Sequence, residues 1–373
     1  MSRLRPLLLF GTRPEAIKMA PVVIECRRRP EAIDPIVCDV GQHRELLEPV
    51  AEYFGLRPDC RLDVMRPGQS LAELTSACIA AIDGLLADTE PDCLVVQGDT
   101  TTVMAASLAA FYRSVPLAHV EAGLRTGNLR APWPEELNRR VVSLSAALHF
   151  APTRRAADAL LAEGVPPAAV HVTGNTVIDA LLWTVERERA RAEQWQRKYA
   201  MLGSRPMVLI TGHRRESFGP GLQAICQAIA TLAERFPDVA FLYPVHLNPN
   251  VLGPARRMLS GRPNVHLTEP AAYPEFVWLM QRATLLLTDS GGVQEEAPSL
   301  RKPVLVTRET TERPEAVEAG AAELVGTFFD AIVDRVSLLL TDPAEYARRQ
   351  VAVSPYGDGQ AARRIVDVLE KMT

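Results

Sequence analysis

Short runs of leucine and β-branched residues alternate along the chain with longer segments in which apolar residues recur every three or four positions. This alternation is typical of parallel β-sheets covered by α-helices. In the first half, the pattern predicts strands at residues 7–10, 36–40, 93–97, 117–120, 148–150 and 171–173, with helices between them, for example at 70–86 and 101–111. In the second half, it predicts strands at 207–211, 239–243, 265–267, 285–288 and 303–306.

The length of the chain and one polar segment predict two domains. A chain of 373 residues is longer than one typical domain of about 150 residues. The segment 177–201 is rich in Arg, Glu, Gln and Trp and precedes a breaker at Gly203–Pro206, so we place the junction there. We expect a Rossmann-like domain at 1–176, a second at 177–354, and a closing helix at 355–373 that returns to the first domain. This α/β organisation resembles the GT-B fold, in which two Rossmann-like domains with parallel sheets face each other across a cleft; a fold alone fixes no chemistry.

Composition argues against several classes of protein. The 41 basic and 45 acidic residues nearly cancel, so we expect no nucleic-acid partner. No apolar run approaches the roughly 18 residues of a membrane span, and the apolar N-terminal run enters a loop without a cleavage-site pattern, as a first strand would. Six cysteines without CxxC spacing predict reduced thiols in a cytoplasmic protein.

The common cofactor motifs are missing from the sequence. No GxGxxG follows a predicted strand, no Walker A loop occurs, and the seven histidines form no HxH or HxxxH pair. We therefore expect no cofactor and no metal ion. The chemistry would then depend on carboxylates, histidine and arginine.

A Gly-Gly turn within residues 287–300 is the sharpest candidate anion site. A predicted strand ends there and a helix opens at about Val293, so the amides of Ser290–Gly292 can converge on a phosphate at the positive end of that helix. Glu295 and Glu296 could simply complement the helix dipole, but Glu296 is also well placed to hold a ribose diol.

The first domain has a matching loop at residues 10–21. Pro14 opens a predicted helix, Arg13 lies in the turn before it, and Lys18 follows five residues later. Lysine is rare here, at four of the 41 basic residues, which makes Lys18 notable. Each cation could be a surface charge, but two of them at the carboxyl end of the first strand favour neutralisation of a diphosphate.

Three carboxylates, Asp99, Glu121 and Glu135, follow predicted strands or open a predicted helix in the first domain. Each alone is better explained as a helix cap or as one partner of an i,i+4 ion pair, such as Glu135 with Arg139. Three together at one edge of a domain favour general acid–base chemistry.

Two histidines and an arginine are the candidates in the second domain. His213 directly follows its first strand and precedes two arginines, which suits an acid for a leaving group, although a lone histidine is more often structural. His246 ends another strand and has the weaker case. Arg313 belongs to a second Arg-Pro-Glu-Ala string and could reach a phosphate or a base.

These segments together resemble the non-hydrolysing UDP-N-acetylglucosamine 2-epimerase family. The matching strings, in order, are FGTRPEAIKMAP, GDTTT, HVEAGLRTG, PWPEE, GNTVIDALLW, TGHRRESFG, PVHLNPNV, TDSGGVQEEAPSL and TERPEAV. The resemblance runs from residue 7 to PYGDGQA near the C-terminus. It implies a GT-B-fold homodimer that interconverts UDP-GlcNAc and UDP-ManNAc, supplies UDP-ManNAc for surface polysaccharides, and uses neither metal nor nicotinamide.

The resemblance also implies roles for individual residues. Contacts to the nucleotide sugar carry over to Arg13, Lys18, Asp99, Glu121, His213, Phe276, Ser290, Gly291, Gly292, Glu296 and Arg313. The acid–base set carries over to Asp99, Glu121 and Glu135, supported by Arg139 and His213. A second UDP-GlcNAc, acting as an allosteric activator, would be held by Gln42, His43, Arg66, Gln69, Arg214 and His246. One departure is Ala271, where relatives often have Gln, so a side-chain contact to the base is lost there.

The chemistry that the resemblance implies is an elimination followed by an addition. The proton at C2 of the sugar is not next to a carbonyl, so simple enolisation is not available. Loss of UDP from C1 together with that proton gives a 2-acetamidoglucal, and re-addition of UDP with a proton on the other face gives the epimer. The alternatives are a GT-B glycosyltransferase, a hydrolysing epimerase that releases ManNAc and UDP, and a non-catalytic nucleotide-sugar sensor.

Overall fold

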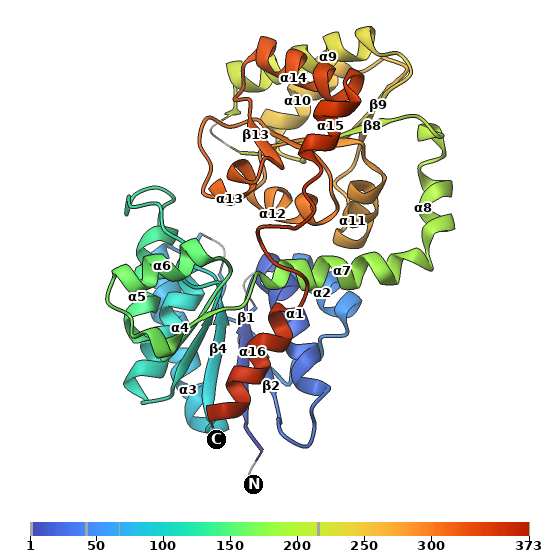
Figure 1. Ribbon diagram of the computed structural model, residues 1–373. Coiled ribbons are helices and arrows are strands. Elements are labelled where there is room, and N and C mark those ends of the chain that lie inside the picture. The colour runs from blue at the N-terminus through green and yellow to red at the C-terminus, as the bar shows by residue number, and fades with distance from the viewer. Residues whose placement is uncertain (1–2, 42–43, 67, 215–216, 373) are drawn as a thin grey trace. The chain divides into compact units, whose positions relative to one another are not determined.

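The computed structural model describes residues 3–41, 44–66, 68–214 and 217–372. The chain forms two compact units (Figure 1): residues 1–180 with 356–373, and residues 181–355. It passes from the first unit to the second within helix α7 (Thr176–Arg189). Among the described residues, no helix is both long enough and apolar enough to cross a membrane.

The first unit contains a seven-stranded parallel sheet in the order β3-β2-β1-β4-β5-β6-β7. Its strands are β1 (Pro6–Phe10), β2 (Ile36–Asp39), β3 (Cys60–Arg61), β4 (Cys93–Gln97), β5 (Leu117–Val120), β6 (Leu148–Ala151) and β7 (Val170–Val172). In the centre, Leu8 lies opposite Val37 of β2 and Val95 of β4. The central strands β1 and β4 are buried along their whole length, which explains their continuous apolar runs.

Helices cover both faces of this sheet: Figure 1 shows α3, α4 and α5 on one side and α1 and α16 on the other. The helices of the unit are α1 (Arg13–Arg27), α2 (Arg44–Phe54), α3 (Leu71–Thr89), α4 (Thr101–Tyr112), α5 (Glu135–Ser145), α6 (Arg154–Ala162), η1 (Pro167–Ala169), α16 (Ala361–Leu369) and η4 (Glu370–Met372). Four of them begin after a Ser or Thr whose hydroxyl accepts a backbone N–H of the first turn, namely Thr12, Ser70, Thr100 and Thr153.

The C-terminal segment is fastened to the first unit by backbone and side-chain bonds. The Asn175 N–H donates to the Tyr356 carbonyl at 2.7 Å. Asp179 of α7 accepts the N–H groups of Ala361 and Ala362, which head α16, at 3.2 and 2.9 Å. Burial raises the pKa of Asp179 to about 6. Helix α16 then packs against α1.

The second unit repeats the same arrangement with six parallel strands in the order β10-β9-β8-β11-β12-β13. The strands are β8 (Met207–Thr211), β9 (Ala240–Pro244), β10 (Val265–Thr268), β11 (Leu285–Thr288), β12 (Val304–Val306) and β13 (Ala322–Leu324). The helices are α8 (Ala192–Lys198), η2 (Ala200–Leu202), α9 (Pro220–Arg235), α10 (Pro249–Leu259), α11 (Tyr273–Arg282), α12 (Gly291–Ser299), α13 (Pro314–Glu318), α14 (Phe329–Thr341) and α15 (Pro343–Arg349).

Both sheets therefore have the same strand order, in which the fourth strand lies beside the first: β4 beside β1, and β11 beside β8. This confirms the predicted α/β class with two parallel Rossmann-like sheets. At such a switch point, the loops after neighbouring strands diverge and leave space for a ligand at the carboxyl ends of the strands. The residues after β1, β4, β5, β8 and β11 are thus the ones to examine.

Candidate active site

Glu121 follows β5, and its buried carboxylate is held by a lysine. Lys18 Nζ, from α1, lies 2.7 Å from Glu121 Oε1 and 2.6 Å from Oε2. The side chain of Gln97, at the end of β4, also donates to Oε2, and Asn175 Nδ2 lies 3.5 Å from Oε1. Lys18 thus forms an ion pair with Glu121, which belongs to the same unit.

The backbone that carries Glu121 is tightly constrained. Glu121 has φ +64°, which L-residues other than glycine rarely adopt. Two residues later, Gly123 has φ +91°, and a Cβ there would lie 2.1 Å from the Ala156 carbonyl oxygen. An unfavourable backbone conformation of this kind persists only where the surrounding structure enforces it, and such conformations cluster at functional sites.

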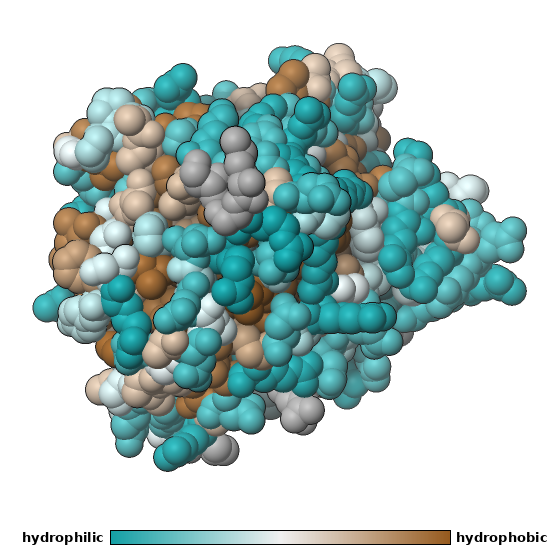
Figure 2. Space-filling view, turned by 90° about the horizontal axis from the view of Figure 1, so that it is seen from below, coloured by the Kyte–Doolittle hydropathy of each residue, from teal (hydrophilic) through white to brown (hydrophobic). Residues whose placement is uncertain are grey.

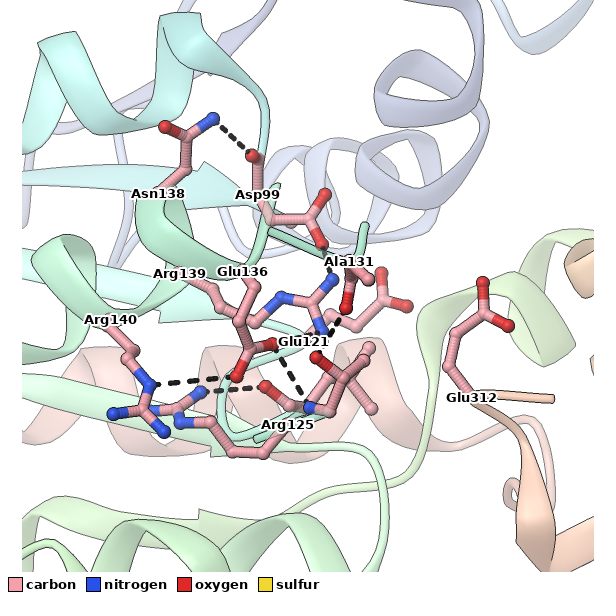
Figure 3. Close-up of polar contacts among 12 residues, drawn as sticks. Asp99, Glu121, Arg125, Ala131, Glu136, Asn138, Arg139, Arg140 and Glu312 are labelled. Carbon is pink, nitrogen blue, oxygen red and sulfur yellow. Dashed lines mark hydrogen bonds and ion pairs between the residues drawn. The ribbon is translucent and has the colours of Figure 1, made fainter. Parts of the chain in front are cut away.

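Asp99 follows β4 and is paired with an arginine of α5 (Figure 3). Arg139 Nη2 lies 2.6 Å from Asp99 Oδ2, and Asn138 Nδ2 donates to the Asp99 carbonyl at 2.9 Å. The carboxylate of α5 that pairs with Arg139 is Glu136, at 3.2 Å. Its neighbour Glu135 is half-buried at the first position of the helix.

Glu15 connects the loop after β1 to the loop after β4. Its Oε2 accepts the N–H groups of Gly11 and Thr12 at 2.7 and 2.8 Å, and its Oε1 accepts the Thr100 hydroxyl at 2.6 Å. Burial raises the pKa of the Glu15 carboxyl although these hydrogen bonds oppose the shift. Glu15 therefore fixes the start of α1 relative to the residue that follows Asp99.

The buried His119 is bonded to the loop that follows β4. His119 Nε2, on β5, donates to the Gly98 carbonyl at 2.7 Å. Burial, followed by the nearby His149, Arg125 and Arg139, lowers the pKa of His119 to about 3. The imidazole is therefore neutral near pH 7 and serves as a fixed hydrogen-bond donor to the residue before Asp99.

In the second unit, His213 follows β8 and pairs with a buried aspartate. His213 Nδ1 lies 3.2 Å from Asp289 Oδ1, while Oδ2 accepts the backbone N–H groups of His213 and Arg214 at 2.7 and 2.8 Å. Burial alone would raise the pKa of Asp289, but the His213 contacts and the Arg214 N–H lower it overall. The rings of His213 and His246 are stacked, with centroids 5.8 Å apart.

The N-terminus of α12 lies next to two arginines. A Cβ built on Gly291 would be 3.8 Å from Arg214 Nη2 and 3.9 Å from Arg313 Cζ. Helix α12 begins at Gly291, two residues earlier than predicted, and the Ser290 N–H donates to the Thr288 hydroxyl at 3.0 Å. The amides that open the helix, together with these two cations, form a site suited to an anion.

The remaining candidates of the second unit lie on α11 and α12. Glu295 and Glu296 are buried, so they do more than complement the helix dipole from the surface. Glu295 pairs with Arg313, and Glu296 accepts the hydroxyl of Tyr273 at 2.8 Å. Phe276 is half-buried on α11.

The residues expected at a second ligand site are only partly described. Gln42 and His43 lie outside the described residues. Arg66 and Gln69 form a turn before α3, in which the Arg66 N–H donates to Gln69 Oε1 at 3.2 Å. Arg214 and His246 belong to the second unit.

Several residues in this geometry were not predicted from the sequence, among them Glu15, Gln97, His119, Glu136 and Asp289. A signal existed for Glu15, because Thr12 and Glu15 have the spacing of a capping box, which the structure contains. For Asp289, the signal was its place directly after a strand. Nothing in the sequence separates Glu136 from its neighbour Glu135.

Comparison with known proteins identifies the family of the chain. A family model described as UDP-N-acetylglucosamine 2-epimerase matches residues 24–370. The UDP-N-acetylglucosamine 2-epimerase of Escherichia coli K12 is 50% identical over 371 residues, which cover 98% of each chain. The crystal structure of the Neisseria meningitidis UDP-GlcNAc 2-epimerase bound to UDP-GlcNAc is 47% identical, covers 99% of this chain and 100% of that one, and superposes with a TM-score of 0.93. A Methanocaldococcus jannaschii UDP-GlcNAc 2-epimerase in complex with UDP-GlcNAc and UDP is 31% identical, with a TM-score of 0.81 and coverage of 99% and 100%.

The neutral His119 predicts a loss of stability in acid. An unfolded histidine takes up its proton near pH 6.5, whereas folded His119 does so only near pH 3. Its contribution is therefore complete above pH 6.5 and is lost as the pH falls towards 3, because the unfolded chain binds the extra proton. His119→Gln keeps a donor for the Gly98 carbonyl but cannot titrate. In urea denaturation between pH 6.5 and 4.5, we expect the free energy of unfolding of this variant to fall less steeply, by up to about 1.4 kcal/mol per pH unit. Equal slopes for variant and wild type would contradict the assignment.

Proposed function

This chain belongs to the UDP-N-acetylglucosamine 2-epimerase family, and on that premise we propose that it interconverts UDP-GlcNAc and UDP-ManNAc without hydrolysis. The observation that carries the proposal is the ion pair between Lys18 and Glu121 beside the Asp99–Arg139 pair. The two pairs supply carboxylates that can accept a proton. Both carboxylates lie at the edge of the sheet where ligands bind. The product would serve the synthesis of surface polysaccharides in the cytoplasm.

In the first half-reaction, the C2 proton passes to a carboxylate while the C1–O bond to UDP breaks. The electron pair of the C2–H bond forms the C1=C2 double bond, and the pair of the C1–O bond leaves with UDP. The reverse steps with protonation on the other face of C2 give the epimer. Two faces of one carbon must be served, so we assign the acid–base work to Asp99, Glu121 and Glu135 together. His213 would donate a proton to the leaving group, and Arg139 would orient Asp99.

The departing diphosphate would be stabilised by the cations and amides at the switch points. In the second unit these are the N-terminus of α12 and Arg313, beside which Arg214 also lies. In the first unit they are Arg13 and Lys18. Charge that develops on a leaving group is stabilised most by donors already in place before the reaction. Glu296 would hold the ribose and Phe276 would contact the base.

The proposal is tested by NMR of UDP-GlcNAc with the protein in D₂O. We expect UDP-ManNAc to appear and deuterium to enter at C2 of both sugars, because the proton removed exchanges with solvent before it returns. A glycosyltransferase would leave C2 free of deuterium, a hydrolysing enzyme would release ManNAc and UDP, and a sensor would give neither exchange nor product. Any of these outcomes would overturn the proposal.

Matched variants in the same assay address the carboxylates. Asp99→Asn, Glu121→Gln and Glu135→Gln should each lower turnover by at least about 100-fold, since a positioned acid or base contributes about 10²- to 10⁴-fold. Binding of UDP, measured by calorimetry, should persist in all three. Rates near the wild-type value in all three variants would remove the assignment.

We further propose that UDP-GlcNAc activates the enzyme at a second site formed by Gln42, His43, Arg66, Gln69, Arg214 and His246. This predicts little conversion of UDP-ManNAc alone and an abrupt onset when a trace of UDP-GlcNAc is added. Progress curves from purified UDP-ManNAc give the measurement. Brisk reverse turnover without a lag or cooperativity would reject the second site.

We also propose that the protein is a homodimer, and an exposed apolar face of the first unit supports this. Phe111 and Tyr112 end α4 and are 65% and 71% exposed, while Leu137 and Leu144 on the neighbouring α5 are 46% and 88% exposed. In Figure 2 hydrophobic residues gather towards the left edge, the side on which Figure 1 draws these two helices. Such groups of exposed apolar side chains mark interaction sites, and a two-fold axis would pair the face with itself.

Light scattering would test this face. Leu144→Glu should shift the mass from two chains towards one at micromolar concentration, because a carboxylate cannot be buried there without a partner. Val353→Glu, which alters an apolar residue of the second unit that is 77% exposed, should leave the mass unchanged. A wild-type mass of one chain, or a dimer that tolerates Leu144→Glu, would exclude the proposed interface.

A further inference from the structure

Glu136, on α5, is completely buried and has polar contacts on several sides (Figure 3). Its Oε2 accepts the Thr126 N–H at 3.1 Å and lies 3.2 Å from Arg139 Nη1. Its Oε1 accepts the Gly127 N–H at 3.2 Å and lies 3.6 Å from Arg140 Nε. A buried carboxylate needs this many partners, because an uncompensated charge there would cost several kcal/mol.

These contacts connect the loop after Glu121 to α5. Thr126 and Gly127 follow Glu121 by five and six residues, and the Thr126 hydroxyl donates to the Ala131 carbonyl at 2.6 Å, just before the helix. The Glu136 carboxylate therefore fixes the path of the chain between Glu121 and the start of α5.

Arg139 extends the connection from Glu136 to Asp99. Its Nη1 faces Glu136 and its Nη2 donates to Asp99 at 2.6 Å. Nε and Nη1 of Arg139 are buried and have no hydrogen-bond acceptor among the described residues, so the charge of Glu136 is what compensates this side of the guanidinium. Because a guanidinium is a rigid planar fork, fixing one end of it directs the other.

We propose that Glu136 is a positioning residue for the epimerisation. It acts through Arg139 in two ways: it directs the guanidinium at Asp99, and it shares the positive charge so that Arg139 does not neutralise Asp99 alone. Glu135, one residue earlier, points about 100° away around the helix and belongs to the acid–base set. The two adjacent glutamates thus have different functions. This inference rests on the proposed function.

The effect on pH dependence follows from the charges around Asp99. The described groups that face this loop are Arg139 and Glu136 from α5, Lys18 and Glu15 from α1, the neutral His119 from β5, and Glu121 and Arg125 from the loop after β5. Glu136→Gln removes one negative charge from this group. The carboxylates that remain then keep their charge to a lower pH, because less negative charge opposes their ionisation.

The test compares Glu136→Gln with wild type in the conversion of UDP-GlcNAc. We expect kcat to fall 10- to 100-fold with KM unchanged within about threefold, since a misdirected catalytic group costs rate and not ground-state binding. We expect the acid limb of the kcat–pH profile to move to lower pH by roughly half a unit to one unit. The double variant with Arg139→Gln should be no slower than Arg139→Gln alone, because residues that act through one another are not additive.

The matched control is Glu163→Gln. Glu163, the residue after α6, is not in the group that faces Asp99; it is one-third exposed and pairs with Arg125 at 2.7 Å, with no bond to Arg139 among the described contacts. The kcat of Glu163→Gln should stay within about twofold of the wild-type value. The acid limb of its kcat–pH profile should stay within about 0.2 pH units of wild type. If Glu136→Gln does not fold by circular dichroism, Arg139→Lys replaces it: a single ammonium cannot serve both carboxylates, so the same loss of kcat is expected.

An unmoved acid limb, an additive double variant, or a wild-type kcat in the folded test variant would overturn the role of Glu136. These outcomes are distinct from failure of the proposed function. If the proposed function itself failed, the wild-type protein would form no UDP-ManNAc and incorporate no deuterium at C2.

Discussion

A charged carboxylate can remain beneath the surface only when cations and N–H donors surround it. The candidate site is built on this constraint. Glu121 is held by Lys18, and Asp289 by His213 and two backbone amides. The partners come from different strands and helices, so each carboxylate is in place only when the parallel sheet has brought the ends of those elements together. The proposed chemistry thus depends on the fold, because only the folded sheet brings each buried carboxylate together with the groups that compensate its charge.

Much of the fold was predictable because the central strands are buried on both faces and read as continuous apolar runs. The predicted bounds of β4, β5, β8 and β11 match the structure residue for residue. The strands that were missed are β3, with two residues, and β13, with the sequence Ala-Glu-Leu, which are too short to show a pattern. The predicted start of α12, at Val293, is two residues too late because the prediction left Gly291 and Gly292 in the turn. In the structure Ser290 is the N-cap and both glycines belong to the first turn of the helix.

The sequence indicates which positions carry the candidate residues, but not which of these residues bond to each other. Strand ends locate Asp99, Glu121 and His213 in the sequence, since a polar residue within two positions of the end of a buried strand is conspicuous. The direction of a side chain depends on the backbone and on neighbours distant in the chain, so the bond from Lys18 to Glu121 could not be foreseen. The same limit applies to the choice between adjacent glutamates, which depends on a helical phase of about 100° per residue.

The fastening of residues 356–373 to the first unit has a consequence for the order in which the molecule is made. The second unit is one continuous stretch and has all its residues once the ribosome has passed Pro355. The first unit starts with residues 1–180 but lacks helix α16, which packs against α1, until residues 361–369 have been translated. During synthesis, therefore, the unit that starts first is completed last, and the apolar surface beneath α16 stays uncovered while the whole second unit is translated.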